Sequence, residues 1–227
     1  MTFSAPIKLA TNWMDEVPNP STVDFIDVSQ AAPIDPPPLE MREAMAEFLC
    51  YDEQSHLYGP ILGNPELRKA LAKHWSIIYG NNVPMEKIAI TSGCNQAFCA
   101  TISALTIEKD EIILAAPWYF NHKMWLDMMG IKVKVLQSNN ELLPSPEKAS
   151  KLITSRTRAI CLVSPNNPAG IEYPDKLLQK FFQLGKTNGI NIILDETYKD
   201  FHSNPNQPHR LLLQDKWDET LIQLYSF

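Results

Sequence analysis

Residues 159–198 read AICLVSPNNPAGIEYPDKLLQKFFQLGKTNGINIILDETY. An apolar run at 159–163 is followed by a proline-rich turn, and a second apolar run occupies 190–194. Between them, residues 175–184 show the spacing of an amphipathic helix. Two buried strands connected through a helix indicate a parallel pair, because a crossover of this length returns the chain to the same edge of the sheet.

The same alternation continues on both sides of this stretch. Short apolar runs also occur at 88–91, 111–115, 132–136 and 221–225, and helical patterns at 39–49, 64–80, 96–105 and 120–129. The helix over 64–80 has a strong start signal, since Asn64 is a good cap residue and Pro65 suits the first helical position. We therefore predict a three-layer α/β/α fold of class α/β, with a mostly parallel sheet covered by helices on both faces.

The first forty residues differ from the rest. Pro18, Pro20, Pro33 and the run 36–38 are expected to prevent regular helix in this stretch. We interpret residues 1–40 as an N-terminal arm that contributes to a small domain, and residues 41–227 as the large domain.

Composition narrows the class of protein. The chain has 227 residues, 44% of them hydrophobic, and a net charge of −6, which argues against nucleic acid or an anionic membrane as partner. No apolar run approaches the ~20 residues of a membrane span, and residues 1–16 lack the apolar stretch of a signal peptide. This favours the cytoplasm. The four cysteines show no paired spacing, so we expect reduced thiols and no metal site.

Ligands of such sheets bind beyond the carboxyl ends of the strands. The residues that follow the strands are therefore the candidates: Ser92-Gly93-Cys94-Asn95, Pro117-Trp118-Tyr119, Asn166-Asn167-Pro168-Ala169-Gly170 and Asp195-Glu196-Thr197-Tyr198. Small residues that open a helix suit a phosphate, although a tight turn explains them equally well. An aspartate at the end of an apolar strand is costly to bury unless a cation meets it.

Taken in order, these four motifs resemble those of the class I and II aminotransferases, enzymes that depend on pyridoxal phosphate. The segment Tyr58-Gly59-Pro60 with Gly63 to Arg68 resembles the part of the family upstream of them, and Asn121-His122-Lys123 the part that follows the aromatic. Any one motif is weak evidence, whereas five in the right order are strong.

The resemblance implies a cofactor role for each position. Asp195 would pair with the protonated pyridine nitrogen, while Tyr198 and Asn167 would bind the phenolic oxygen. Tyr119 would stack on the ring. The phosphate would be bound by the backbone at Gly93, Cys94 and Asn95 and by the Ser226 hydroxyl. Tyr58 would reach the phosphate of a neighbouring subunit, which implies a homodimer with shared active sites, and Ala31 would lie near the substrate carboxylate.

One residue that this family requires is not in the chain. The resemblance places a Ser-Lys pair, whose lysine forms the Schiff base, just after Phe227, together with the C-terminal part of the fold. Lys199 is not a substitute, and we expect it to be exposed. The five histidines show no ligand spacing and are assigned no chemistry. The family also uses cis peptide bonds at Ala116-Pro117 and Asn167-Pro168.

The function that the resemblance implies is transfer of an amino group between an amino acid and a 2-oxo acid. A carbon–sulfur β-lyase on the same fold is the nearest alternative, because the same carbanion can eliminate. Two further alternatives are a non-catalytic domain that binds the cofactor and an inactive fragment. Which amino acid is the donor is left open.

Overall fold

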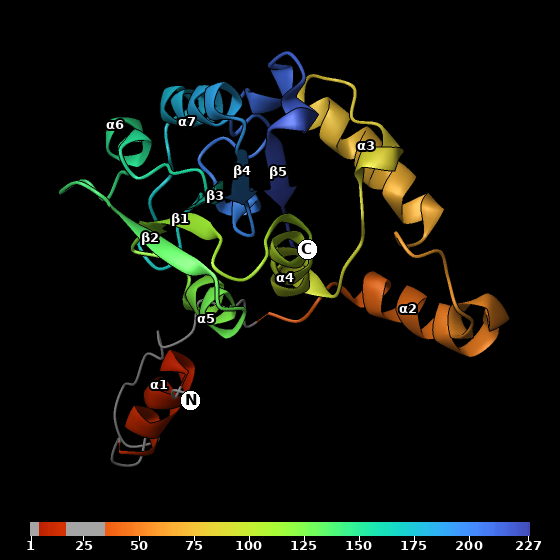
Figure 1. Cartoon of the computed structure of the whole chain (residues 1–227). Helices are drawn as coiled ribbons and strands as arrows, with labels where there is room; N and C mark the ends of the chain where they lie inside the picture. The colour runs from red at the N-terminus through yellow and green to blue at the C-terminus, as the bar shows by residue number, and fades with distance from the viewer. Residues whose placement is uncertain (1–4, 17–34) are drawn as a thin grey trace. The chain divides into compact units, whose positions relative to one another are not determined.

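Five strands form one sheet in which every pair of neighbours is parallel, in the order β2-β1-β3-β4-β5 (Figure 1). Their bounds are β1 Glu111–Ala116, β2 Lys132–Gln137, β3 Thr157–Val163, β4 Asn191–Asp195 and β5 Leu221–Leu224. The computed structural model describes residues 5–16 and 35–227. Within these residues the chain divides into two units, one up to Tyr58 and one from Gly59 to Phe227. The sheet belongs to the second unit.

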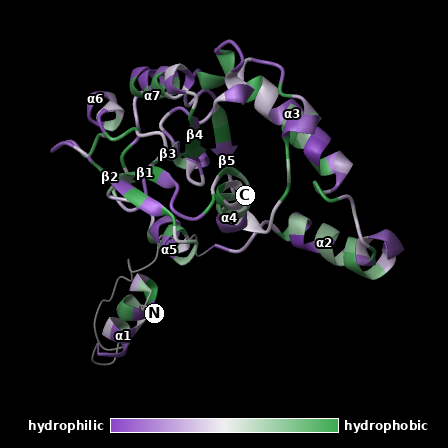
Figure 2. Cartoon of the chain, in the orientation of Figure 1, coloured by the Kyte–Doolittle hydropathy of each residue, from purple (hydrophilic) through white to green (hydrophobic). Residues whose placement is uncertain are grey.

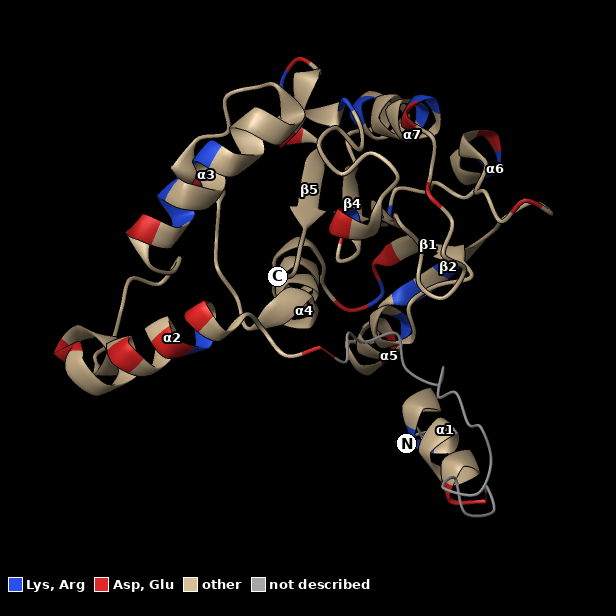
Figure 3. Cartoon of the chain, turned by 180° about the vertical axis from the view of Figure 1, so that it is seen from behind, with Lys and Arg blue, Asp and Glu red and all other residues tan. Residues whose placement is uncertain are grey.

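Helices cover both faces of the sheet, which confirms the three-layer prediction. Alternate residues of a strand point to opposite faces. In β1, Ile113 packs into the core beneath α7 (Asp175–Asn188), whereas Ile112 packs into a second core beneath α4 (Gly93–Leu105) and α5 (Phe120–Met128). Strand β4 is green in Figure 2, whereas β2, at the edge of the sheet, alternates between purple and green, and β5 has no charged residue in Figure 3. Burial on both faces explains the continuous apolar runs in the sequence.

Helix α3 (Pro65–Tyr79) begins and ends as its sequence predicts. The Asn64 side chain accepts hydrogen bonds from the backbone N–H groups of Glu66 and Leu67, at 2.8 and 3.4 Å. Gly80 follows the helix at φ 65°, a left-handed conformation that glycine adopts without strain. Its C-terminal residue Tyr79 is almost completely buried against the α7 side of the sheet.

The remaining elements of the second unit are short. They are η3 (Met85–Lys87), α6 (Pro146–Ser150), η4 (Lys199–Phe201), η5 (Leu211–Leu213) and η6 (Trp217–Glu219). None of the five was predicted, because single turns are too short to show a periodic pattern. Among the described residues, no helix is long and apolar enough to cross a bilayer.

The strand predicted at residues 88–91 is wrong. Its backbone is extended at Ile88, but it joins no ladder of the sheet. The Ile90 N–H instead donates to the Leu62 carbonyl, and the Ile88 carbonyl accepts from the Arg68 side chain. An apolar sequence can adopt the conformation of a strand, but a strand of a sheet also needs a neighbouring backbone.

Helix α7 is longer than its sequence pattern indicated. We expected it to end at Leu184, before a glycine, but it continues to Asn188 and ends at Gly189 with φ 64°. A Cβ atom built on Gly185 would lie 2.9 Å from the Ile190 carbonyl oxygen and from Ile192 Cγ1. The glycine at 185 therefore permits close packing of α7 on the sheet rather than ending the helix.

The first unit is helical in its described part, with α1 (Pro6–Asp15), α2 (Leu39–Tyr51) and η2 (Glu53–His56). Helix α2 agrees with the predicted 39–49, and its acidic residues are coloured red in Figure 3. The expectation that the first forty residues contain no regular helix is wrong for α1. This helix precedes Pro18, and its own proline, Pro6, occupies the first helical turn, where no N–H is needed.

Candidate active site

A cavity of about 250 Å³ lies at the carboxyl ends of the strands, beside the point where the strand order reverses between β1 and β3. The chain segments that follow β1, β3, β4 and β5 all reach it, together with the start of α4. Its lining residues are Ser92, Gly93, Cys94, Asn95, Tyr119, Val163, Asn167, Asp195, Thr197, Tyr198 and Ser226. The structure therefore brings together eight of the ten predicted site residues; their roles remain predictions.

The first turn of α4 forms one wall of the cavity. Gly93 has φ 79°, so the chain turns sharply from residues 88–91 into the helix. The first N–H groups of a helix have no partner within it, and the helix dipole makes this end positive. Cys94 and Asn95 belong to this turn and line the cavity. This wall is suited to an anionic group such as a phosphate.

Asp195, at the end of β4, is the carboxylate that lines the cavity. Its side chain is almost fully buried, and Oδ1 accepts hydrogen bonds from the Thr197 N–H and hydroxyl at 2.9 and 2.8 Å. Oδ2 lies 3.1 Å from Nε2 of the buried His122. Burial alone would raise the pKa of Asp195, but the contacts with His122 and Thr197 outweigh it and hold this pKa below its ordinary value. The carboxylate is therefore charged at neutral pH.

His122 is a functional candidate that the sequence did not reveal. Its ring stacks on Phe98 at 4.0 Å and lies edge-on to Tyr119 at 5.3 Å, measured between ring centroids. Nδ1 lies 3.8 Å from Sγ of Cys161. No short spacing connects His122 to Asp195, so only the fold could show the pair. The signal present in the sequence was its place in Asn121-His122-Lys123, two residues from the start of α5.

Aromatic and amide side chains complete the cavity. The Tyr119 hydroxyl accepts from Asn121 Nδ2 at 2.7 Å. Burial raises the pKa of Tyr198, and the charges of Tyr119 and Asp195 add to this effect, whereas a hydrogen bond with Asn167 opposes it. Tyr198 therefore keeps its proton, and its hydroxyl can donate to an oxygen of a ligand.

The two asparagines of the 166–170 turn have different functions. Asn166 is buried, and its amide contacts the Pro117 carbonyl at 3.3 Å and the Tyr173 hydroxyl at 3.4 Å, so it stabilises the turn. Asn167 lines the cavity. Peptide bonds 116–117 and 167–168 are cis, as predicted, and Ser164-Pro165 is a third cis bond that was not predicted.

Two predicted site residues do not line the cavity. Tyr58 is fully exposed and belongs to the first unit, and Ala31 lies outside the described residues. The prediction that Lys199 is exposed is wrong. It is 1% exposed, because η4 turns it inward, where Nζ lies 2.5 Å from Oδ1 of Asp200 and over the Tyr225 ring. Lys199 does not line the cavity.

A second cavity, of about 530 Å³, runs along the free edge of β5. Residues 88–91 line its other side, so it separates them from the sheet. Its lining is mostly apolar. The carboxylate in this lining, Asp218, is at the surface and pairs with Lys87, so it is unlike the buried Asp195. We therefore assign the ligand site to the smaller cavity.

The structure thus defines a parallel α/β protein in which a helix N-terminus and a buried aspartate line one cavity at the carboxyl edge of the sheet. The chain belongs to the class I and II aminotransferase family, whose model matches residues 23–227.

Relatives of known name support this assignment. The aspartate/prephenate aminotransferase of Thermus thermophilus is 29% identical over 180 residues, which are 78% of this chain and 46% of that protein. An aromatic aminotransferase of Arabidopsis thaliana is 30% identical over 170 residues, 73% of this chain and 42% of the relative. The solved aspartate aminotransferase of Thermus thermophilus with maleate superposes with a TM-score of 0.84 at 25% identity, covering 98% of this chain and 57% of that one. The chain thus spans about half the length of these curated relatives.

Proposed function

We propose that this protein is part of a pyridoxal-phosphate-dependent aminotransferase, which moves an amino group between an amino acid and a 2-oxo acid. The observation that carries the proposal is the single cavity that joins the α4 N-terminus, Tyr119, Asn167, Asp195 and Tyr198. These residues are distant in sequence, so local structure alone does not explain their convergence. The family assignment supports the same reaction.

The residues of the cavity fit this cofactor at both of its charged ends. Asp195 is a buried anion, and among residues 5–16 and 35–227 the basic side chain that contacts it is His122. A protonated pyridine nitrogen supplies the cation that such a carboxylate favours. At the other end, the N–H groups of Cys94 and Asn95 and the hydroxyl of Ser226 suit the phosphate. When bound, pyridoxal phosphate supplies an electron sink for the carbanion formed at the substrate α-carbon.

Each side chain has a distinct task in this proposal. Asp195 keeps the proton on the ring nitrogen, and His122 and Thr197 hold Asp195 in its orientation. Tyr198 and Asn167 bind the phenolic oxygen, and Tyr119 packs on the face of the ring. Such preorganised contacts cost no rearrangement when charge develops during the reaction.

The proposed reaction also needs a lysine amine, which moves the substrate proton. No lysine of the described residues lines the cavity, and Lys199 is held by Asp200 away from it. The Ser-Lys pair that the family resemblance places after Phe227 remains a prediction. So do the homodimer with Tyr58 shared between subunits, the N-terminal arm of residues 1–40, and the cytoplasmic location.

The direct test is an amino-transfer assay on the full-length protein. Because relatives are named for aspartate, prephenate and aromatic amino acids, aspartate and phenylalanine are the first donors to try, with 2-oxoglutarate as acceptor. We expect glutamate to form only when pyridoxal phosphate is present, and the rate to fall about 100-fold or more in Asp195→Ala, as for loss of a group that stabilises the developing charge. Release of pyruvate and ammonia from a β-substituted amino acid, without glutamate, would instead establish the lyase.

A further inference from the structure

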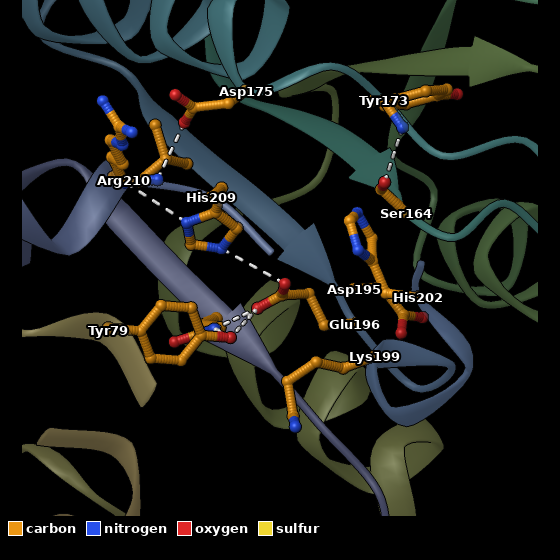
Figure 4. A network of polar contacts seen from close by, with 12 residues as sticks. Tyr79, Ser164, Tyr173, Asp175, Asp195, Glu196, Lys199, His202, His209 and Arg210 are labelled. Atoms are coloured by element: carbon orange, nitrogen blue, oxygen red, sulfur yellow. Dashed lines mark hydrogen bonds and ion pairs between the residues drawn. The ribbon is translucent and has the colours of Figure 1, made fainter. Parts of the chain in front are cut away.

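A buried polar cluster lies next to the candidate site, on the other face of the sheet, and contributes nothing to the cavity. We define the Glu196 cluster as Tyr79, Glu196, His209 and Gln223. Figure 4 labels the first three of these residues. Tyr79, Glu196 and His209 are each only 1% exposed. None of the four lines the cavity that holds Asp195.

The Glu196 carboxylate is surrounded by donors from three segments of the chain. Oε2 accepts from the Tyr79 hydroxyl at 2.9 Å and from the Gln223 amide. Oε1 lies 3.2 Å from His209 Nε2, although that N–H does not point straight at the oxygen. The His209 ring also stacks on Tyr79, with centroids 4.9 Å apart. The end of α3, the loop before η5 and strand β5 are thus all tied to one residue at the end of β4.

The protonation of the cluster follows from its contacts. His209 Nδ1 accepts the Leu211 backbone N–H at 3.2 Å, so the ring proton of the neutral histidine is on Nε2, the nitrogen that faces Glu196. Burial raises the pKa of Tyr79, and the charge of Glu196 raises it further, so Tyr79 remains a donor. The buried Glu196 carboxyl is therefore held by donors from three segments, and losing any one of them leaves one of its oxygens less well hydrogen-bonded.

The end of β4 and the turn that follows it divide their residues between two sides. Asp195, Thr197 and Tyr198 line the cavity, whereas Glu196 and Lys199 are buried outside it. The two residues on the buried side also make backbone hydrogen bonds. The Glu196 N–H donates to the Leu224 carbonyl at 2.8 Å, and the Lys199 N–H donates to the Glu196 carbonyl at 2.9 Å. The cavity residues of this turn are therefore fixed through residues that do not touch the ligand.

We infer that Glu196 is a positioning residue for the cofactor site: its buried contacts with Tyr79, His209 and Gln223 fix the turn that carries Asp195 and Tyr198. Through Gln223 it also fixes the end of β5, three residues before Ser226. This inference rests on the proposed function, since it names a residue that acts on the cofactor through Asp195. A misplacement of about 1 Å at such a site can cost about 100-fold in rate, so a residue outside the cavity can control what happens within it.

The test compares Glu196→Gln and Tyr79→Phe with a matched control in the full-length protein. Glu196→Gln keeps the shape but removes the charge, and Tyr79→Phe removes one donor while leaving Glu196 in place. The control is Asp110→Asn. Asp110 is also a buried carboxylate, paired with Arg158 at 3.0 Å, but it precedes β1, at the amino end of the sheet.

Two quantities distinguish positioning from a loss of stability alone. One is the affinity for pyridoxal phosphate, with the pH midpoint of its bound absorbance band. The other is hydrogen exchange of the Thr197 amide, which reports its bond to Asp195 without any cofactor. We expect both cluster variants to bind the cofactor about tenfold or more weakly, with a shifted midpoint and faster exchange at Thr197. Asp110→Asn should lower stability and leave the cofactor affinity, its pH midpoint and the Thr197 exchange unchanged.

The possible results separate this inference from the proposed function. Wild-type affinity and wild-type Thr197 exchange in both cluster variants would overturn it, and so would the same changes in Asp110→Asn. If the wild-type protein does not bind pyridoxal phosphate, the proposed function fails, and the exchange at Thr197 alone decides whether Glu196 fixes the turn.

Discussion

At the residue scale, the central feature is a buried carboxylate that remains charged. Asp195 is 3% exposed, yet His122 and the two Thr197 donors hold its pKa below the ordinary 3.8. Burial therefore opposes the contacts with His122 and Thr197, and these contacts prevail. A charged group of this kind is ready to accept a cationic partner without first losing a proton.

This balance predicts a pH dependence of stability. A carboxyl whose pKa is lower in the folded state stabilises the fold above its unfolded pKa, and this contribution is lost as the pH falls through the folded-state value. We expect the free energy of unfolding to decrease below pH 3.8, and to decrease less steeply in Asp195→Asn. Urea denaturation at a series of pH values measures the two slopes. Equal slopes would show that Asp195 has the same pKa in both states.

Cysteine reactivity is a second prediction at this scale. Burial, and next the negative charge of Asp195, raise the pKa of the Cys94 thiol to about 12. The thiolate is the reactive form, so Cys94 should resist alkylation at pH 8, whereas the exposed Cys50 should react. Mass spectrometry after brief iodoacetamide treatment should show Cys50 labelled at least about tenfold faster than Cys94. Comparable labelling of both would mean that the wall of the cavity opens in solution.

The sequence revealed the site residues that directly follow a strand, because their position in the chain fixes their place at the sheet edge. Asp195 and Asn167 were found in this way. His122 and His209 were not, since each meets its carboxylate only after strands and helices have packed. The exposure of Lys199 was wrongly predicted for the same reason. Its neighbour Tyr198 lines the cavity, but η4 turns the Lys199 side chain away from the cavity into a buried position.

At the element scale, the turn that leads into α3 is tightly constrained. Gly63 has φ 97°, and a Cβ atom placed on it would lie 2.5 Å from Ile90 Cβ. Asn64 caps the helix in the next position. The close approach holds residues 88–91 against this turn, which compensates for their lack of a neighbouring strand.

The two positions should therefore respond differently to alanine. We expect Asn64→Ala to lower the free energy of unfolding by about 1 kcal/mol, the usual cost of losing a cap. Gly63→Ala should cost more, because overpacking adds about 1–3 kcal/mol to the strain of a positive φ. Chemical denaturation measures both, and Asn64→Ser, which keeps a capping oxygen, is the control. A Gly63→Ala variant as stable as wild type would contradict the geometry of this turn.

Most elements were predictable because each carries its own periodic signal. The five observed strands differ from their predicted bounds by one or two residues, and the starts of α3, α5 and α7 agree. Residues 88–91 failed because pairing is not a local property. Helix α1 was missed because prolines several residues away were taken to affect the whole N-terminal stretch, although a proline breaks only the turn that it occupies.

At the scale of the whole molecule, the fold brings a positive helix end and a negative carboxylate to one small cavity. The strand order places β1, β3, β4 and β5 side by side, so that loops from distant parts of the sequence meet at their carboxyl ends. Sequence periodicity predicted this sheet, and the family motifs predicted which loops carry ligand contacts. The arrangement behind the cavity, in the Glu196 cluster, depends on tertiary packing and was not predictable.

The most direct test of the central claim is a spectrophotometric titration of the full-length protein with pyridoxal phosphate. We predict saturable binding of one cofactor per chain, weakened roughly 10- to 100-fold in Asp195→Ala, since a hydrogen bond to a charged group contributes about 1.5–3 kcal/mol. Asp127→Asn, which removes a surface carboxylate paired with Lys123 on α5, should bind like the wild type. Undiminished binding by Asp195→Ala, or equal weakening in both variants, would contradict the assignment of the cofactor to this cavity.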